Sequence, residues 1–287
     1  MKKILVATDF STRSDRAIRR ATLLAKTFEA SVSLIHVVDD DRPKRIVDAE
    51  RESASMLLSE QARSLREIDG VDCSASVTLG TLSEEIIKAA EAGMADVLVI
   101  GPHRHQAFQD VFVGTTAERT IRARRHPVLV ANGVPASSYR HVLVAVDLSD
   151  CSRNALRAVK GLALDNHAAV SVVHVFDAPA RSYMALASAG DHDVEDYLAR
   201  EEARAAGELA VFMRDLEFVP ARQVLKSNLS STAHVICATA REVSADLIVV
   251  GTRGRTGVAK FLLGNVAEEV LHIADRDVLA IPPGPLS

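Results

Sequence analysis

The stretch Asp246–Asn265, DLIVVGTRGRTGVAKFLLGN, indicates how the chain folds. It begins with a run of apolar, mostly β-branched residues, which is typical of a strand buried on both faces of a parallel sheet. Glycines follow at Gly251 and Gly254, where bare main chain can turn and bring its N–H groups close to an anion. Gly264 then opens a helix at its positive end. Strand, glycine loop and helix start together predict an anion-binding cradle.

The chain contains an internal repeat. KKILVATDFS at Lys2–Ser11 reappears as RHVLVAVDLS at Arg140–Ser149, and ADVLVIG ending at Gly101 matches ADLIVVG ending at Gly251. In each copy, apolar runs of strand length alternate with segments of helical periodicity, which predicts a parallel sheet covered on both faces, with right-handed crossovers. The 287 residues are enough for two such domains of about 140 residues each.

A short segment rich in Gly, Pro and Ser, Asn132–Arg140, separates the two copies. We therefore predict domains at residues 1–134 and 139–287. The last strand of each copy, Val128–Ala131 and Val278–Ile281, is apolar and would lie at a sheet edge, where exposed main chain invites pairing.

The glycine loop reads G-x-x-G, nine residues, then G-N, and it matches neither the P-loop nor the dinucleotide fingerprint. This spacing resembles the nucleotide loop of the universal stress protein family, G-x-x-G-x(9)-G-[ST], with Asn265 in the place of the hydroxyl residue. The resemblance covers nearly the whole chain, twice. It implies two tandem Rossmann-like α/β domains, each a five-stranded, mainly parallel sheet of the adenine nucleotide alpha hydrolase type with helices on both faces. It also implies that the last strands pair as a pseudo-dimer within the chain, and that the chain forms a homodimer.

Ligands of open α/β sheets bind beyond the carboxyl ends of the strands, where the strand order reverses. The resemblance implies that Asp147 accepts hydrogen bonds from ribose, that Val175 meets adenine with its main chain, and that the glycine loop holds phosphates. The ligand would be ATP, or AMP or ADP, and Mg²⁺ is a candidate to accompany it. The candidate nucleotide-binding residues are Ala145, Val146, Asp147, Val175, Val250, Gly251, Arg253, Gly254, Gly264, Asn265 and Val266.

Structural roles are alternatives for several of these residues. Asp147 could simply cap the helix that begins near Ser152, since Asp is a good N-cap. Arg253, like Arg255 and Lys260, could be a solvated loop cation. For the histidines that recur in both copies, His36 and His174, we expect core imidazoles bonded to main chain rather than ligands.

The first copy departs from the loop pattern. Arg104 occupies the second glycine position, and Pro102 removes a main-chain donor. We therefore predict that the first half binds nucleotide weakly or not at all. His103 and His105, with His126 further on, suggest a metal site. Histidines at i and i+2 without a carboxylate partner are weak evidence for one, so we predict no metal site.

Composition excludes several other classes. No apolar run approaches the ~20 residues that span a bilayer, so we expect no membrane insertion. A net charge of −4 with interspersed signs gives no footprint for nucleic acid. Three cysteines far apart in sequence predict packing thiols. The start, MKKILVATDF, indicates a first strand rather than a signal peptide, so we expect a cytoplasmic protein.

Three functions are suggested by the sequence and the resemblance. The first is a nucleotide-binding regulatory module of the stress response, and the second is a slow ATP hydrolase that uses the same pocket. The third is an assembly protein that binds no nucleotide. Phosphoryl transfer needs a group that orients water near the γ-phosphate, and no second carboxylate or base lies beside the loop in sequence. We therefore predict no catalytic residues and favour regulatory binding.

Overall fold

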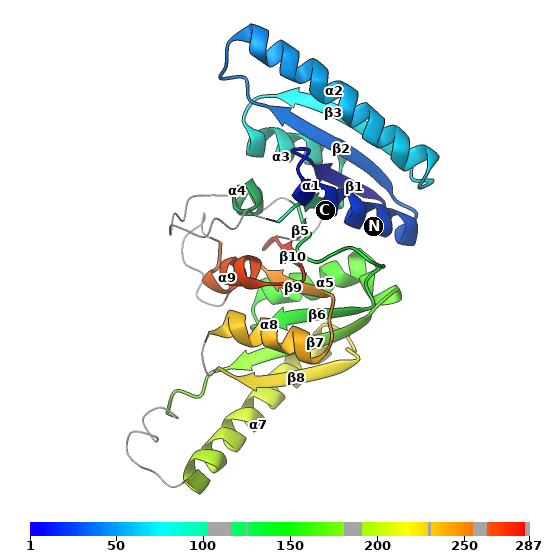
Figure 1. Cartoon of the computed structure of the whole chain (residues 1–287). Coiled ribbons are helices and arrows are strands. Elements are labelled where there is room, and N and C mark those ends of the chain that lie inside the picture. Colours follow the sequence, from blue (N-terminus) through cyan, green and yellow to red (C-terminus); the bar gives the residue numbers. More distant parts are fainter. Residues whose placement is uncertain (103–115, 124–125, 181–190, 229–230, 255–262, 285–287) are drawn as a thin grey trace.

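The computed structural model describes residues 1–102, 116–123, 126–180, 191–228, 231–254 and 263–284. Its strands form one ten-stranded sheet with helices on both sides (Figure 1). The first half supplies β1 (Lys3–Ala7), α1 (Thr12–Phe28), β2 (Ser31–Val38), α2 (Lys44–Glu67), β3 (Cys73–Leu79), α3 (Leu82–Gly93), β4 (Val97–Ile100), α4 (Thr116–Arg122) and β5 (Val128–Val130). The second half supplies β6 (His141–Val146), α5 (Asp150–Gly161), the 3₁₀ turn η1 (Leu164–Asn166), β7 (Ala169–Phe176), α7 (Asp191–Asp215), β8 (Arg222–Ser227), α8 (Thr232–Glu242), β9 (Leu247–Gly251), α9 (Asn265–Ile273) and β10 (Asp277–Ile281).

The two halves have the same strand order. It is β3-β2-β1-β4-β5 in the first half and β8-β7-β6-β9-β10 in the second, and neighbouring strands within a half pair in parallel. The order therefore reverses between β1 and β4 and again between β6 and β9. This confirms the predicted fold class, a twofold use of one α/β unit with helices on both faces.

The halves join through their last strands. β5 and β10 pair antiparallel, with Val130 opposite Val278 and Leu129 opposite Leu279. Each of these strands also pairs with a neighbour in its own half, so the ladder is continuous from β3 to β8.

The core consists of two layers, one on each face of the sheet. Because side chains alternate along a strand, Ile4 and Val6 of β1 face one layer and Leu5 faces the other. Helices α1, α2, α5 and α7 contribute to the first layer, and α3, α4, α8 and α9 contribute to the second. Each layer runs through both halves. Because the strands are buried on both faces of the sheet, their sequences are nearly continuous apolar runs.

Equivalent serines begin α1 and α5. The hydroxyl of Ser11 accepts a hydrogen bond from the main-chain N of Ser14 at 3.4 Å, and Ser149 does the same for Ser152 at 3.3 Å. These helices therefore begin at Thr12 and Asp150, because a serine N-cap fixes the first turn. The start of α5 lies two residues ahead of Ser152, near which the sequence predicts it.

A buried ionic cluster holds the linker between the halves. Arg20 of α1 and Asp277 of β10 are 4% and 0% exposed. Nε of Arg20 lies 2.5 Å from Oδ2 of Asp277, so the two side chains form an ion pair, but this Nε–H is not aligned for a hydrogen bond. Linker groups complete the cluster. Tyr139 donates its hydroxyl to Oδ2 at 2.6 Å, Gly133 donates its N–H to Oδ1 at 2.8 Å, and Arg20 donates to the carbonyl of Ser137 at 2.7 Å.

The two recurring histidines have the structural role predicted for them. Nδ1 of His36 lies 2.8 Å from the carbonyl oxygen of Thr8, and Nδ1 of His174 lies 2.8 Å from that of Val146. Each imidazole thus ties the end of one strand to its neighbour.

The three cysteines are free and buried, which confirms them as packing thiols. Burial raises the pKa of the Cys73 and Cys237 thiols to about 11, so both stay protonated at neutral pH. Among the helices that the structure describes, none combines the length and the apolar character that crossing a bilayer requires.

Candidate functional site

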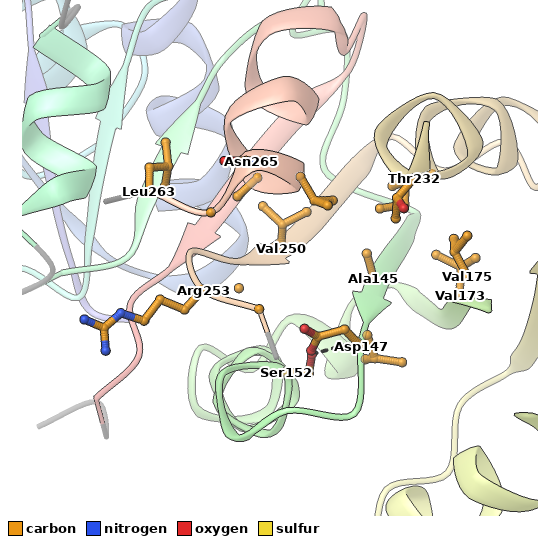
Figure 2. A pocket seen from close by; sticks show the side chains of 17 residues that line it. Ala145, Asp147, Ser152, Val173, Val175, Thr232, Val250, Arg253, Leu263 and Asn265 are labelled. Carbon is orange, nitrogen blue, oxygen red and sulfur yellow. Dashed lines mark hydrogen bonds between the residues drawn. The ribbon is translucent and has the colours of Figure 1, made fainter. Parts of the chain in front are cut away.

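A cavity of about 520 Å³ opens where the strand order of the second half reverses, between β6 and β9 (Figure 2). The carboxyl ends of β6, β7 and β9 and the starts of α8 and α9 surround it. The structure brings all eleven candidate residues together in its lining: Ala145, Val146, Asp147, Val175, Val250, Gly251, Arg253, Gly254, Gly264, Asn265 and Val266.

Six further residues line this cavity and were not predicted from the sequence: Ser152, Val173, Thr232, Ile236, Leu263 and Ala267. Most are apolar or small, and none belongs to a ligand motif. Thr232 and Ile236 lie one turn apart on α8, so the i, i+4 spacing of that predicted helix was the available signal.

The cavity is apolar at one end and polar at the other. In Figure 2, Val173, Val175 and Thr232 lie at one end, and Arg253 and Leu263 lie at the opposite end. The apolar end is suited to a flat ring, and a single hydroxyl, that of Thr232, is placed among its aliphatic walls.

Asp147 is held rigidly by the start of α5. Its Oδ1 accepts hydrogen bonds from the N–H of Ser149 at 3.1 Å, from the hydroxyl of Ser149 at 2.5 Å and from the hydroxyl of Ser152 at 2.5 Å. The N-cap of α5 is Ser149, so the alternative in which Asp147 caps this helix is wrong. Its other oxygen, Oδ2, faces the glycine loop, because a Cβ atom at Gly254 would lie 3.0 Å from it.

Bare main chain forms the polar end. The N–H of Gly264 donates to the carbonyl oxygen of Thr252 at 2.9 Å, which ties together the two ends of the loop. A Cβ atom at Gly264 would lie 3.6 Å from Cα of Arg253 and 3.7 Å from N of Gly254. Gly264 is also the N-cap of α9, and no side chain among the described residues caps this helix. Within the described part of the chain, the first N–H groups of α9 therefore have no side-chain acceptor at the end of the cavity where an anion would be stabilised.

Gly251 has a packing role that the motif does not reveal. A Cβ atom there would lie 2.9 Å from Sγ and 3.2 Å from the carbonyl oxygen of Cys151, at the start of α5. Burial raises the pKa of the Cys151 thiol, and main-chain donors of Arg253 and Thr252 only partly oppose this, so the thiol is an uncharged neighbour. The absence of a side chain at Gly251 is therefore needed for helix packing.

Arg253 is less exposed than the alternative interpretation, a solvated loop cation, requires. It is half-buried, and its Nε finds no hydrogen-bond partner in the described part of the chain. Its side chain runs away from Val175 and Thr232 in Figure 2, at the polar end of the cavity. The other loop cations, Arg255 and Lys260, lie outside the described residues.

The candidate metal ligands of the first half fall mostly outside the described residues. His103 and His105 are among those left out, as is Arg104 at the second glycine position. Within the described ranges, no three His, Cys, Asp or Glu side chains come together in a way that could hold a metal ion.

Comparisons with known proteins agree on one family. A family model described as the universal stress protein family matches residues 1–132 and 138–282. The chain is 34% identical over 150 residues to universal stress protein A homolog 1 of Coxiella burnetii, an alignment that covers 50% of this chain and 96% of that protein.

Two solved structures resemble nearly the whole fold. One is a universal stress protein from Archaeoglobus fulgidus DSM 4304, with a TM-score of 0.70, 21% identity and 98% of each chain covered. The other is a protein from Pseudomonas aeruginosa PAO1 described as functionally unknown, with a TM-score of 0.68, 21% identity and coverage of 99% of this chain and 93% of that one. With both family matches and this shared architecture, the chain belongs to the universal stress protein family and carries two of its domains in tandem.

Proposed function

We propose that the second half of this universal stress protein binds an adenine nucleotide, ATP or its shorter forms ADP and AMP. Occupancy of the pocket would be the regulatory signal that the chain provides in a stress response. The observation that carries this proposal is the bare main chain at Gly254 and Gly264, which meets the uncapped start of α9 at the polar end of a 520 Å³ cavity.

Each part of a nucleotide has a suitable counterpart in this pocket. The aliphatic end with Val173 and Val175 suits the base, and the fixed carboxylate of Asp147 is an acceptor for ribose hydroxyls. The bare main chain at Gly254 and the start of α9 suit phosphate oxygens, and Arg253 at the same end offsets their charge.

We propose binding without turnover. Asp147 is the one carboxylate in the described lining of the cavity, and the family likeness assigns it to ribose rather than to the γ-phosphate. A hydrolase would need a further group to orient water, so hydrolysis is not proposed. Mg²⁺ would neutralise phosphate charge as a counter-ion of the nucleotide rather than as a metal held by the protein. Cytoplasmic location and a homodimer stay predictions.

Calorimetric titration of the whole chain with ATP tests this function. We expect one ATP per chain. We expect Gly264→Val to weaken binding by about tenfold or more, because overpacking costs about 1–3 kcal/mol and 1.4 kcal/mol is tenfold. A Cβ atom at this position meets nothing closer than 3.4 Å, so the fold tolerates the first added carbon.

Gly207→Val on α7 is the matched control, since a Cβ atom there meets nothing within 4 Å and the residue lies outside the pocket. Its ATP affinity should equal that of the parent chain. Mass spectrometry of the denatured, purified protein should release an adenine nucleotide. Absence of both co-purified nucleotide and ATP binding would overturn the proposal, and so would an unchanged affinity in Gly264→Val.

A further inference from the structure

Helices α4 and α9 occupy equivalent positions in the two halves, and they meet where the halves join (Figure 1). Each of them lines a cavity. Ala267 of α9 is part of the wall of the 520 Å³ cavity, and Ala117 of α4 is part of the wall of a smaller one. The smaller cavity, of about 320 Å³, lies at the carboxyl ends of β1, β2 and β4, the equivalent point of the first half. A charge at this junction therefore lies on helices that form cavity walls.

Arg122, in the last turn of α4, is shared between the two helices. Its Nη2 lies 3.7 Å from Oε2 of Glu268 on α9, and 3.7 Å from Oε2 of Glu118 on its own helix. The side chains of Arg122 and Glu268 are 34% and 26% exposed, so water screens this pair less than it screens a fully exposed one. The first half thus places a cation against the helix that begins at the polar end of the other half's pocket.

Glu268 is an unfavourable neighbour for an anionic ligand. It lies in the first turn of α9, where a carboxylate interacts favourably with the positive end of the helix. A phosphate at the same end would compete for that field and would be repelled by the charge of Glu268. Neither Glu268 nor Arg122 lines the cavity, so both act on a ligand through charge rather than through contact.

The next residue, Glu269, holds α9 from another side. Its Oε1 accepts a hydrogen bond from the hydroxyl of Ser231 at 2.8 Å and lies 3.2 Å from Nδ1 of His234, both at the start of α8. α9 therefore keeps a side-chain anchor on α8 when its pair with α4 is removed. A change at Arg122 is expected to alter the charge around α9 and not the position of the helix.

The junction is asymmetric in charge. Through the repeat, Glu118 corresponds to Glu268, but Arg122 corresponds to His272. An arginine is always charged, whereas a histidine carries a charge only when it is protonated. Of these four residues, the permanent cation therefore belongs to the first half and faces the helix that lines the pocket of the second.

We propose that Arg122 of the first half strengthens the binding of anionic ligands in the pocket of the second half, by neutralising Glu268 across the junction. Arg122 is a positioning residue, which acts through Glu268 and does not touch the ligand. The two halves thus form one binding unit, and the first half sets how strongly the phosphates are held. This inference rests on the proposed function, because the anion is the phosphate chain of the nucleotide.

Equilibrium dialysis of the whole chain against ATP and, separately, against uncharged adenosine tests the inference. Arg122→Met should weaken ATP binding by about threefold to tenfold, the size of a charge effect at a helix end, and should leave adenosine binding unchanged. The loss should shrink as the salt concentration rises. Arg119→Met is the matched control, because it removes an exposed cation from the same helix, and its ATP affinity should equal that of the parent chain.

A rescue experiment separates charge from packing. Adding Glu268→Gln to Arg122→Met removes the carboxylate that the arginine neutralises, so ATP affinity should return to within about twofold of the parent value. Arg122→Lys keeps the charge and should retain most of the affinity. Thermal unfolding should show that all these variants fold.

The outcomes separate this inference from the function proposed above. Equal losses of ATP and adenosine in Arg122→Met, or no rescue by Glu268→Gln, overturn the inference and leave the nucleotide site standing. A loss of ATP affinity in Arg119→Met as large as that in Arg122→Met also overturns it. Failure of the parent chain to bind either ligand at millimolar concentration overturns both proposals.

Discussion

The two pockets share one end and differ at the other. Both have aliphatic walls and a serine-held carboxylate, Asp9 or Asp147. Beyond the fourth strand of each half, the chain continues as Gly101-Pro102 in one and as Gly251 to Gly254 in the other. The cavity is about 320 Å³ in the first case and about 520 Å³ in the second. One fold can thus keep the aliphatic walls and the serine-held carboxylate of a cavity while the residues beyond its fourth strand change.

The glycines of the loop are not equivalent in their roles. Gly101 and Gly251 occupy equivalent positions in the two halves, and at both a Cβ atom would collide with the start of a helix, α1 or α5. Their presence therefore reports on packing. Gly254 instead faces the carboxylate of Asp147, where a Cβ atom would lie 3.0 Å from Oδ2.

The largest effect is expected from a substitution outside both pockets, at a position where the two halves differ. Through the repeat, Arg20 corresponds to Ala158 and Asp277 to Pro127, so the buried ion pair occurs once and makes the junction asymmetric. Arg20→Met leaves the carboxylate of Asp277 buried without its cation. We expect urea denaturation to show a free energy of unfolding lower by about 3–5 kcal/mol.

The control is Lys26→Met on the same helix, which removes an exposed pair with Asp69 and should cost about 1 kcal/mol or less.

The deficit of Arg20→Met should depend on pH. Burial raises the pKa of Asp277, although Arg20 and Tyr139 act against it. Because the pKa of Asp277 is raised in the folded state, the free energy of unfolding falls as the pH rises through that pKa. Loss of Arg20 raises the pKa of Asp277 further. The deficit of Arg20→Met should therefore shrink as the pH is lowered. A pH-independent deficit, or one as small as that of the control, would contradict this account.

A smaller effect is expected at the two equivalent carboxylates. In Asp147→Asn, the amide oxygen can still accept from Ser149 and Ser152, but the second oxygen becomes a donor and cannot accept from ribose. A hydrogen bond to a charged group contributes about 1.5–3 kcal/mol, so ATP affinity should fall by about tenfold or more. Asp9→Asn should leave ATP affinity unchanged in the same titration. Equal losses in the two variants would show that ATP uses both halves.

The smallest effect is expected at Arg13. Its pair with Asp9 is 3.7 Å long and exposed, with 38% of the Arg13 side chain open to solvent. Arg13→Ala should therefore change the free energy of unfolding by less than about 1 kcal/mol. ATP should still bind at one site per chain. A second ATP site in this variant would show that the Arg13 guanidinium keeps phosphate out of the first half.

Local signals explain the features that could be predicted from the sequence. The alternation of apolar runs and helical periodicity is enough for the fold class, and the repeat is visible in aligned strands such as ILVAT and VLVAV. All eleven candidate residues line one cavity because they lie at strand ends or beside glycines, positions that the topology of a doubly wound sheet brings together.

Features that depend on tertiary contacts were not predictable. The bond between Tyr139 and Asp277 joins residues 138 positions apart, and no local pattern relates them. The packing of Gly251 against Cys151 was missed for the same reason, since the motif suggests only a turn. Thr232 was missed because helix starts carry many hydroxyl residues as caps, and here the neighbouring Ser231 is the one that caps α8.

The pairing of β5 with β10 has a consequence for assembly. Each of these strands has a neighbour on both sides, so neither offers a free edge to a second copy of the chain. Self-association has to use the outermost strands or the helical surfaces instead. A protease nick between residues 133 and 139 would also fail to release two fragments, because the shared sheet and the Arg20–Asp277 pair hold the pieces as one particle without a covalent connection.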